Sequence, residues 1–295
     1  YFFDNNFMKD LHESLTVTIV LYNEKFEVLS KCLDQIKRCK IIIIDNGKDI
    51  DLQKKIQSKY EIFKYVLNDK NLGFSKGINQ AIRLCDTEFI LNLEADCIIS
   101  KENISKLLEI FEKYENCMIS TPTMIDENNN LTHSGGALVE KGLGYKVLNL
   151  NGDVCVDFPM TAAILFKKKD MIEIGLFDED LFIYYPDIEI GRRIKSFKRS
   201  VIQSYNSRAI HDMGTLKINN PIKRVYYRNY YFTLDGLIYY YKAGLHKKPI
   251  IELKQEIGKM IKKLIFKIYK IKFVDILVCI SKISAYYTFK KKYLK

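Results

Sequence analysis

Two carboxylates stand one residue apart directly after an apolar segment, in the stretch FILNLEADCIIS (89–100). Glu94 and Asp96 follow FILNL, whose apolar character is typical of a buried strand. In an extended chain the two side chains point to opposite sides, but a turn can direct both toward one ligand. A divalent cation with a bound diphosphate needs only one or two protein carboxylates. The pattern indicates a cation site or, as the alternative, a solvated loop acid and an acid near a helix start.

A second pair of acids, Asp187 and Glu189, stands in YYPDIEIGRR (184–193) near the expected start of a helix. Pro186 restrains the backbone just before Asp187, so this carboxylate would be presented rigidly, as suits a general base. The alternative is structural, because acids in the first turn of a helix cap it and favour its dipole. His211 follows an apolar strand-like stretch and is either a structural histidine or a ligand.

The elements that position these residues alternate between strand-like and helix-like segments from residue 15 to residue 122. Short β-branched runs are expected as strands, and stretches with apolar residues three and four apart as helices. The expected strands are 15–23, 40–45, 62–68, 88–93 and 117–122, and the helices are 26–39, 51–60, 74–85 and 101–114. This alternation predicts an α/β fold with a mostly parallel central sheet covered by helices on both faces.

Ligands of such sheets bind beyond the carboxyl ends of the strands. That rule selects four short segments as candidate site residues: Tyr22–Glu24, Asp45–Gly47, Asn68–Gly73 and Glu94–Asp96. The later chain is less regular, with a strand expected at 162–168 and a helix at 187–197. After Pro221 the sequence has a helical period, is rich in aromatic residues and then becomes rich in lysine.

The composition is that of an ordinary globular protein, with 47% hydrophobic and 28% charged residues among 295. The seven cysteines form no CxxC pair, which argues against a disulfide framework or a zinc site and for a reducing compartment. No uncharged apolar run approaches the roughly 20 residues that span a bilayer, and the first residues lack a signal-peptide pattern. These observations predict a cytoplasmic protein.

The positive charge is concentrated toward the C-terminal end. Most of the net charge of +11 lies in residues 259–295, which hold eleven lysines and one acid, Asp275. Lysines interleaved with Ile, Leu, Phe and Tyr suit a basic amphipathic helix on the inner face of an anionic membrane. They equally suit a solvated helical pair that packs on the rest of the protein. Nucleic acid is the least favoured partner, because no nucleic-acid-binding motif accompanies the charge.

Seven short motifs occur in an order that resembles the family 2 inverting glycosyltransferases, in particular the bacterial rhamnosyltransferase-like members that build cell-surface polysaccharides. They are VLYN (20–23), IIIDNG (42–47), NLGFSKGIN (71–79), LNLEAD (91–96), GLFDEDLFIYYPDIEIGRR (175–193), His211 and YYRNYY (226–231). The resemblance covers roughly residues 16–232. The resemblance implies a GT-A fold and a nucleoside-diphosphate sugar as the donor.

The resemblance also implies where the donor binds. Asp45 matches a contact to the nucleobase, with Tyr22 and Asn23 beside it. The loop and helix start next to the diphosphate would consist of Asn71, Gly73, Lys76 and Asn79. A helix N-terminus favours phosphate through its exposed N–H groups, and a lysine there adds positive charge.

In the same family LNLEAD stands where a metal-binding Asp-x-Asp motif is usual, which assigns Asp96 as a ligand of Mn or Mg. Glu94 occupies the first acidic position, which varies in the family and contacts ribose or a metal-bound water. His211 matches a histidine that completes the metal and diphosphate site in several members. Asp187 matches the proposed catalytic base, and Pro186 replaces the glutamate that normally precedes that base.

From the resemblance we predict a GT-A catalytic domain over 1–220, with a donor half at about 16–122 and an acceptor half at about 123–220. A basic, aromatic-rich helical region would form 221–295. Loop residues around 123–165 would select the donor sugar.

The predicted activity is inverting, metal-dependent transfer of one sugar from a UDP- or dTDP-sugar to a glycan or polyprenyl-diphosphate-linked acceptor. The alternatives are a nucleotide-sugar nucleotidyltransferase, whose Gly- and Lys/Arg-rich loop is absent after the first expected strand, and a nucleotide-sugar binding module without turnover. A dehydrogenase is disfavoured because GxGxxG does not follow that strand. A processive synthase is disfavoured because the chain has no Trp for the Gln-x-x-Arg-Trp motif.

Overall fold

The computed structural model describes residues 14–132, 135–136, 151–211, 218–266 and 273–294, with the side chains of 263–266 excepted. The chain forms two compact units. The first consists of Tyr1–Asp178 and Asp187–Gly214, and the second of Glu179–Pro186 and Thr215–Lys295. The short segment Glu179–Pro186 thus groups with the C-terminal helices although the chain on both sides of it belongs to the first unit. The donor and acceptor halves and the boundary at residue 220 stay predictions.

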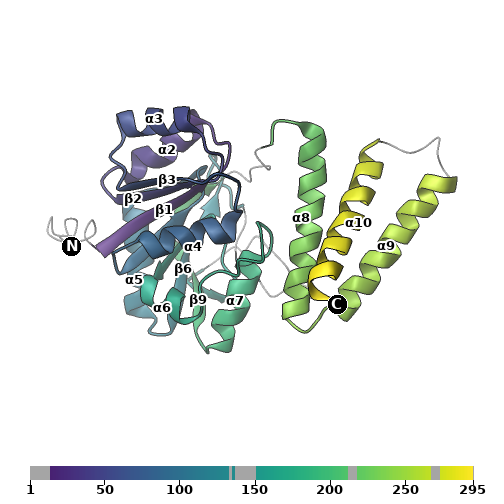
Figure 1. Ribbon diagram of the computed structural model, residues 1–295. Coiled ribbons are helices and arrows are strands. Elements are labelled where there is room, and N and C mark those ends of the chain that lie inside the picture. The colour runs from purple at the N-terminus through teal and green to yellow at the C-terminus, as the bar shows by residue number, and fades with distance from the viewer. Residues whose placement is uncertain (1–13, 133–134, 137–150, 212–217, 267–272, 295) are drawn as a thin grey trace. The chain divides into compact units, whose positions relative to one another are not determined.

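The first unit is built on a sheet flanked by helices (Figure 1). In the described residues this sheet has nine strands in the order β3-β2-β1-β4-β8-β6-β9-β5, with β7 beside β9. The strands are β1 (Leu15–Leu21), β2 (Lys40–Asp45), β3 (Lys64–Leu67), β4 (Phe89–Leu93), β5 (Cys97–Ile99), β6 (Cys117–Ile125), β7 (Val154–Val156), β8 (Ala163–Lys167) and β9 (Ser200–His211). The first four are parallel, as the alternation predicts. The rest of the sheet is mixed, because β8 runs antiparallel to β4 and β6, while β9 is parallel to β6.

Helices cover both faces of the sheet because neighbouring strand residues point in opposite directions. The helices of this unit are α2 (Phe26–Ile36), α3 (Ile50–Lys59), α4 (Phe74–Leu84), α5 (Lys101–Lys113), α6 (Lys168–Glu173) and α7 (Pro186–Ser196). In β2, Ile41 and Ile43 enter one core with residues of α2, α3 and α5. Ile42 and Ile44 enter the other core with residues of α4, α6 and α7. The sheet is therefore buried on both sides, and its ligand sites are left at the strand ends.

Polar residues at those strand ends begin the helices. The Asp49 side chain accepts a hydrogen bond from the Leu52 N–H at the start of α3, and Ser100 accepts one from Asn103 at the start of α5. At the start of α4, Gly73 takes a φ of 81°. Glycine adopts this left-handed region without steric cost, so the loop can turn sharply into the helix. Asp49 and Gly73 thus fix the paths of two loops that leave the carboxyl edge of the parallel strands, whereas Ser100 caps the helix that follows the antiparallel strand β5.

The second unit contains three helices in its described residues, α8 (Pro221–Lys242), α9 (Lys247–Phe266) and α10 (Phe273–Tyr293). Asn220 caps α8 by accepting from the N–H groups of Ile222 and Lys223, and Pro221 occupies the first helical position. In the part of the chain that the structure describes, no helix combines the length and the apolar character that crossing a bilayer requires.

Candidate functional site

The two acids of the LNLEAD motif and a distant histidine are brought together by the pairing of two strands. The chain turns after β4, where the Cys97 N–H donates to the Glu94 carbonyl at 3.0 Å. It then forms β5, which pairs antiparallel with β9 so that Cys97 lies opposite His211. Because His211 is the last residue of β9, this register places its side chain beside the turn that carries Glu94 and Asp96.

Glu94, Asp96 and His211, here called the ligand cluster, have the chemistry of a cation site. Their ligand atoms all lie within 4.8 Å of one another. The Nε2 atom of His211 is 3.3 Å from a Glu94 oxygen and 3.5 Å from an Asp96 oxygen. This nitrogen is buried and makes no hydrogen bond of good geometry. An orphaned imidazole nitrogen facing two carboxylates fits a divalent metal ion, which binds such donors in their deprotonated forms.

Without a metal, a protonated His211 would offset one of the two negative charges of the ligand cluster. Burial lowers the pKa of His211, but the neighbouring carboxylates of Asp96 and Glu94 outweigh it and raise the pKa to about 10. His211 is therefore an imidazolium between two carboxylates at neutral pH. A metal ion bound in the ligand cluster would take the place of that proton.

Asp187 is a buried carboxylate at the second position of α7, after Pro186 at the first. It is only 9% exposed. Burial raises its pKa to about 7, and the negative charge of Glu94 acts in the same direction, whereas the Ile188 N–H, which donates to Oδ1 at 2.9 Å, opposes the rise. A carboxyl group with a pKa near neutrality can take up a proton and release it again at physiological pH.

Helix α7 packs on the rest of the first unit through a close backbone approach at Gly191. A Cβ atom at Gly191 would lie 2.2 Å from the Asp157 carbonyl oxygen and 2.7 Å from the Phe158 Cα atom, so only glycine fits. One turn further along, Lys195 pairs with Asp157 at 2.9 Å. The helix that carries Asp187 therefore has a fixed position in its own unit.

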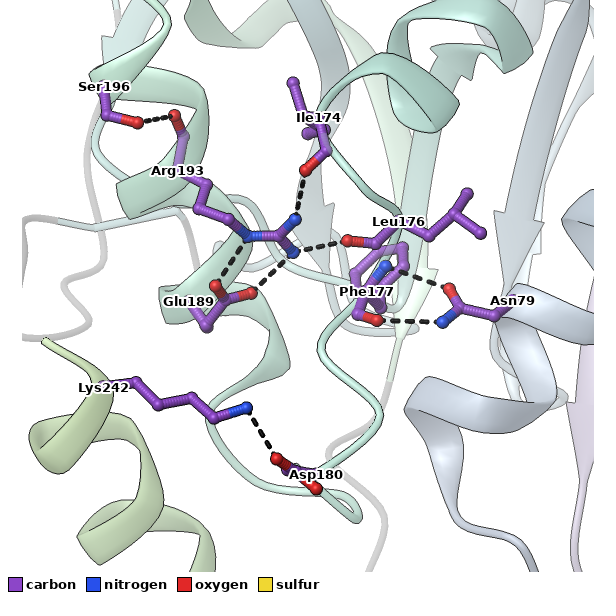
Figure 2. Close-up of polar contacts among 9 residues, drawn as sticks. All are labelled: Asn79, Ile174, Leu176, Phe177, Asp180, Glu189, Arg193, Ser196 and Lys242. Atoms are coloured by element: carbon purple, nitrogen blue, oxygen red, sulfur yellow. Dashed lines mark hydrogen bonds and ion pairs between the residues drawn. The ribbon is translucent and has the colours of Figure 1, made fainter.

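Arg193 ties α7 to the loop between α6 and α7 (Figure 2). Its guanidinium forms a bidentate pair with Glu189 one turn earlier, with N–O distances of 2.6 and 2.7 Å. It also donates to the carbonyls of Ile174 and Leu176. Leu176 has a φ of 63°, a conformation that non-glycine residues rarely adopt and that the two carbonyl contacts help to hold. Sequence reasoning assigned Glu189 no such pairing and Arg193 no role.

Asn79 holds the same loop from the side of α4 (Figure 2). Its Nδ2 donates to the Phe177 carbonyl and its Oδ1 accepts from the Phe177 N–H, both at 2.9 Å. The side chain is 1% exposed. The geometry thus gives Asn79 a structural role in joining α4 to the loop, and its contact with a donor stays a prediction.

The residues expected near a nucleobase lie at the ends of β1 and β2. Asp45 is 1% exposed and accepts from the N–H groups of Gly47 and Asp49 and from the Tyr65 hydroxyl, at 2.7, 3.2 and 3.0 Å. A Cβ atom at Gly47 would lie within 3.2 Å of Asn23 and Asp45, so these three residues are close neighbours. Asn23 is exposed with a φ of 52°, and Tyr22 before it is partly exposed.

The residues expected near the diphosphate lie at the start of α4. Asn71 accepts from the Gly73 N–H at 2.8 Å, and Lys76 is exposed in the first turn. Two buried amides that sequence reasoning gave no individual role connect this loop to the sheet: Asn46 donates to the Gly73 carbonyl at 3.1 Å, and Asn68 donates to Asn46 at 2.9 Å. In the sequence, each of these two asparagines could be recognised as a polar residue that directly follows an apolar strand.

Comparison with known proteins decides the family. The family model described as glycosyl transferase family 2 matches residues 16–172. The chain belongs to this family. It is therefore a glycosyltransferase, and the resemblance to rhamnosyltransferase-like members that the motifs indicate is confirmed.

Two curated relatives of this family 2 member cover most of its length. The dTDP-rhamnosyl transferase RfbF of Shigella flexneri is 25% identical over 232 residues, which are 73% of this chain and 78% of that protein. The low-salt glycan biosynthesis hexosyltransferase Agl10 of Haloferax volcanii is 23% identical over 231 residues, which are 74% of this chain and 71% of that protein.

Two solved structures show that the fold is the predicted GT-A fold. GalNAc-T7 with UDP, GalNAc and Mn2+ has a TM-score of 0.56 at 14% identity; the match covers 76% of this chain and 51% of that one, so it spans about half the length of GalNAc-T7. The mannosyltransferase PcManGT from Pyrobaculum calidifontis, in complex with GDP-Man and Mn2+, has a TM-score of 0.54 at 11% identity, covering 93% of this chain and 86% of that one.

Replacing Arg193 with methionine should lower the free energy of unfolding by about 2–4 kcal/mol. Hydrogen bonds to charged groups contribute about 1.5–3 kcal/mol each, and the carboxylate charge of Glu189 would lose its bidentate guanidinium partner. Adding Glu189→Gln should recover part of the loss, because it removes that charge. Urea denaturation followed by far-UV circular dichroism measures all three proteins.

Lys106→Met is the matched control for this measurement. Lys106 also pairs with an acid one turn earlier, Glu102, but that acid is 78% exposed, against 13% for Glu189. Exposed ion pairs contribute about 0–1 kcal/mol, so the control should unfold at nearly the parent midpoint. Equal midpoints for the Arg193 variant and the parent would contradict the role of Arg193 in holding the loop.

Proposed function

We propose that this glycosyltransferase moves one sugar from a UDP- or dTDP-sugar to a glycan or polyprenyl-diphosphate-linked acceptor, with inversion at the anomeric carbon, in bacterial surface polysaccharide synthesis. The observation that carries the proposal is the combination, in one unit, of a cation-type ligand cluster with a buried carboxylate, Asp187, whose pKa is about 7. Inverting transfer to a hydroxyl needs both parts: positive charge at the leaving diphosphate and a base for the acceptor proton.

The names of the relatives support the class of donor. RfbF is named a dTDP-rhamnosyl transferase, and the two structural neighbours hold UDP and GDP-Man. In this chain the donor would lie along the ends of β1 and β2 and the start of α4, where Tyr22, Asn23 and Lys76 have exposed surface. The loops at 123–165 that would select the sugar include 133–134 and 137–150, which lie outside the described residues.

Asp96 and His211 would hold a Mn or Mg ion, with Glu94 beside them. Such an ion supplies positive charge that stabilises the departing nucleoside diphosphate. The chain contributes the carboxylates, the imidazole and the fixed β5–β9 register that keeps them together. The side chain of Glu94 is 43% exposed and that of Asp96 is 19% exposed, so Asp96 is the better enclosed ligand.

Asp187 would accept the proton of the acceptor hydroxyl as that oxygen attacks the anomeric carbon. Its burial removes competing water and places its pKa near the working pH, where a general base is most effective. The hydroxyl oxygen forms the new glycosidic bond, the bond from the anomeric carbon to the diphosphate breaks, and the proton goes to Asp187. Attack from the face opposite the leaving group inverts the configuration.

We further propose that α10 binds anionic lipids on the inner face of the cytoplasmic membrane. A lipid-linked acceptor would be located at the same surface. Phe273, Ile276, Ile280 and Tyr287 are 59%, 36%, 48% and 63% exposed, and their spacing puts them on one face of the helix. Lysines 290–292 form its last turn. An apolar stripe with neighbouring lysines can insert into the interface while its charges attract acidic lipids.

A panel of UDP-, dTDP- and GDP-sugars with Mn or Mg tests the function. One donor should release its nucleoside diphosphate, detected by mass, and this release should stop with EDTA and resume when the metal is restored. Asp96→Asn should weaken Mn binding at least tenfold, measured by calorimetry, and Glu94→Gln should do so less. Turnover that persists in EDTA would refute the metal role, and transfer of a nucleotide instead of a sugar would refute the activity.

Asp187→Asn should lower kcat by about 10²–10⁴, the usual contribution of a positioned base, with an unchanged donor dissociation constant. In the parent enzyme kcat/KM should fall tenfold per pH unit below about 7, because only the deprotonated carboxylate accepts a proton. Near-normal turnover of the Asn variant would remove Asp187 from the mechanism.

The stability of this variant provides a second measurement. The folded pKa of Asp187 is raised from 3.8 to about 7, so ionising this carboxyl costs the native state progressively more as the pH rises through that window. Above pH 7, Asp187→Asn should therefore unfold at an equal or higher urea concentration than the parent. A lower midpoint at pH 8 would show that the carboxylate is stabilising.

For the membrane surface, the double variant Phe273→Ser with Ile280→Ser should sediment at least tenfold less with vesicles containing phosphatidylglycerol. Two inserted apolar side chains contribute about 1.5–3 kcal/mol each. Ile172→Ser is the matched control, because Ile172 is 52% exposed in the first unit. Vesicles of phosphatidylcholine alone should bind the parent weakly, and equal sedimentation of the double variant and the parent would exclude α10 from membrane contact.

A further inference from the structure

Asp235 is a completely buried carboxylate in the middle of α8, a helix that the sequence presents as aromatic-rich. It is 0% exposed. Its Oδ2 accepts hydrogen bonds from the N–H groups of Ile183 and Tyr184, both at 2.9 Å. All three residues belong to the second unit. Burying a charge is expensive unless it is hydrogen-bonded, so a carboxylate at this position is explained by the backbone that it holds.

The next residue, Tyr185, is held by the same helix. Its φ of 67° is unusual for a residue with a side chain and persists only where the surroundings enforce it. Its ring stacks on Tyr239 with centroids 5.5 Å apart and packs against Phe232 at 5.7 Å. A Cβ atom at Gly236 would lie 3.2 Å from the Tyr185 ring, so the ring lies directly on the helix backbone.

A further contact holds the beginning of this segment. Asp180 pairs with Lys242 at the end of α8 at 2.7 Å (Figure 2) and with Lys292 at the end of α10. Partial burial of Asp180 acts to raise the pKa of its carboxyl group. The two lysines outweigh burial and keep that pKa below its usual range. The segment 179–185 is therefore fastened by salt bridges near its start and by Asp235 near its end.

The turn that Asp235 holds runs straight into α7. Pro186 follows Tyr185 as the first residue of the helix, and Asp187 is the second. Only Pro186, whose ring fixes φ, separates the held backbone of Tyr185 from Asp187. Asp187 therefore follows, after one residue, a turn that α8 holds.

We propose that Asp235 is a positioning residue for sugar transfer: by holding the turn Ile183–Tyr185, it fixes the start of α7 and thereby the place of the Asp187 carboxylate. The inference rests on the proposed role of Asp187 as the base. Asp235 touches neither donor nor acceptor in this role, so its loss should affect the transfer step and leave donor binding intact.

The test uses the full-length enzyme with its active donor and three variants. Asp235→Ala removes both acceptor oxygens, and Asp235→Asn keeps one that can still accept a backbone hydrogen bond. Gly236→Ala pushes on the Tyr185 ring from the helix while replacing glycine by a better helix former. Glu252→Gln in α9 is the matched control, since it neutralises an acid of the same unit that pairs with Lys248.

Asp235→Ala should lower kcat by about 10- to 100-fold, the usual effect of a small misplacement of a reacting group, with the donor KM and dissociation constant unchanged. Asp235→Asn should recover part of this loss. Gly236→Ala should lower kcat without lowering the unfolding midpoint. This variant therefore still tests the proposal if the Asp235 variants fold poorly. Glu252→Gln should match the parent.

The pH profile separates positioning from simple loss of folded enzyme. A displaced Asp187 is better solvated, so the acid limb of kcat/KM should move to lower pH in Asp235→Ala and Gly236→Ala. A smaller folded fraction would lower the rate at every pH and leave the limb in place, which would overturn the inference. Parent-like kcat in both variants would overturn it too. A parent enzyme that turns over no donor would refute the proposed function itself.

Discussion

The antiparallel pairing of β5 with β9 is the contact on which the ligand cluster depends. β5 has only three residues, and its register sets Cys97 opposite His211. A shift of one residue would turn His211 to the other face of the sheet and separate it from Glu94 and Asp96. So short a strand has little pairing energy of its own. Its position is secured by the tight turn from β4 and by the length of β9, which is also paired with β6 and β7.

A second constraint is the cost of burying Asp187. A carboxylate with a pKa near 7 opposes folding at neutral pH, so the surroundings must be held by other contacts. The bidentate pair of Glu189 and Arg193, with the carbonyls that Arg193 binds, provides such contacts on the same helix. The close approach at Gly191 provides another. Helix α7 thus carries one carboxylate that destabilises the folded state at neutral pH and several contacts that stabilise it.

The sequence allowed the parallel half of the fold to be predicted because its signals are local. Four consecutive isoleucines in β2 predict a strand buried on both faces, and the polar residues after them mark its carboxyl end. β5 was not predicted, because three residues carry no period. The roles of Arg193 and Asn79 were also beyond reach, since they bind backbone groups of a loop distant in sequence whose left-handed turn only the structure shows.

The grouping of Glu179–Pro186 with the C-terminal helices has a consequence for how this protein can be recombined. The second unit is made of two pieces of chain that are not contiguous, and the shorter piece leads directly into Asp187. A chimaera that exchanges only the C-terminal helices with those of a homologue would pair a foreign α8 with the native segment. Asp235, Gly236 and the residues 183–185 should therefore be inherited together, as one module that is split in the gene and joined in space.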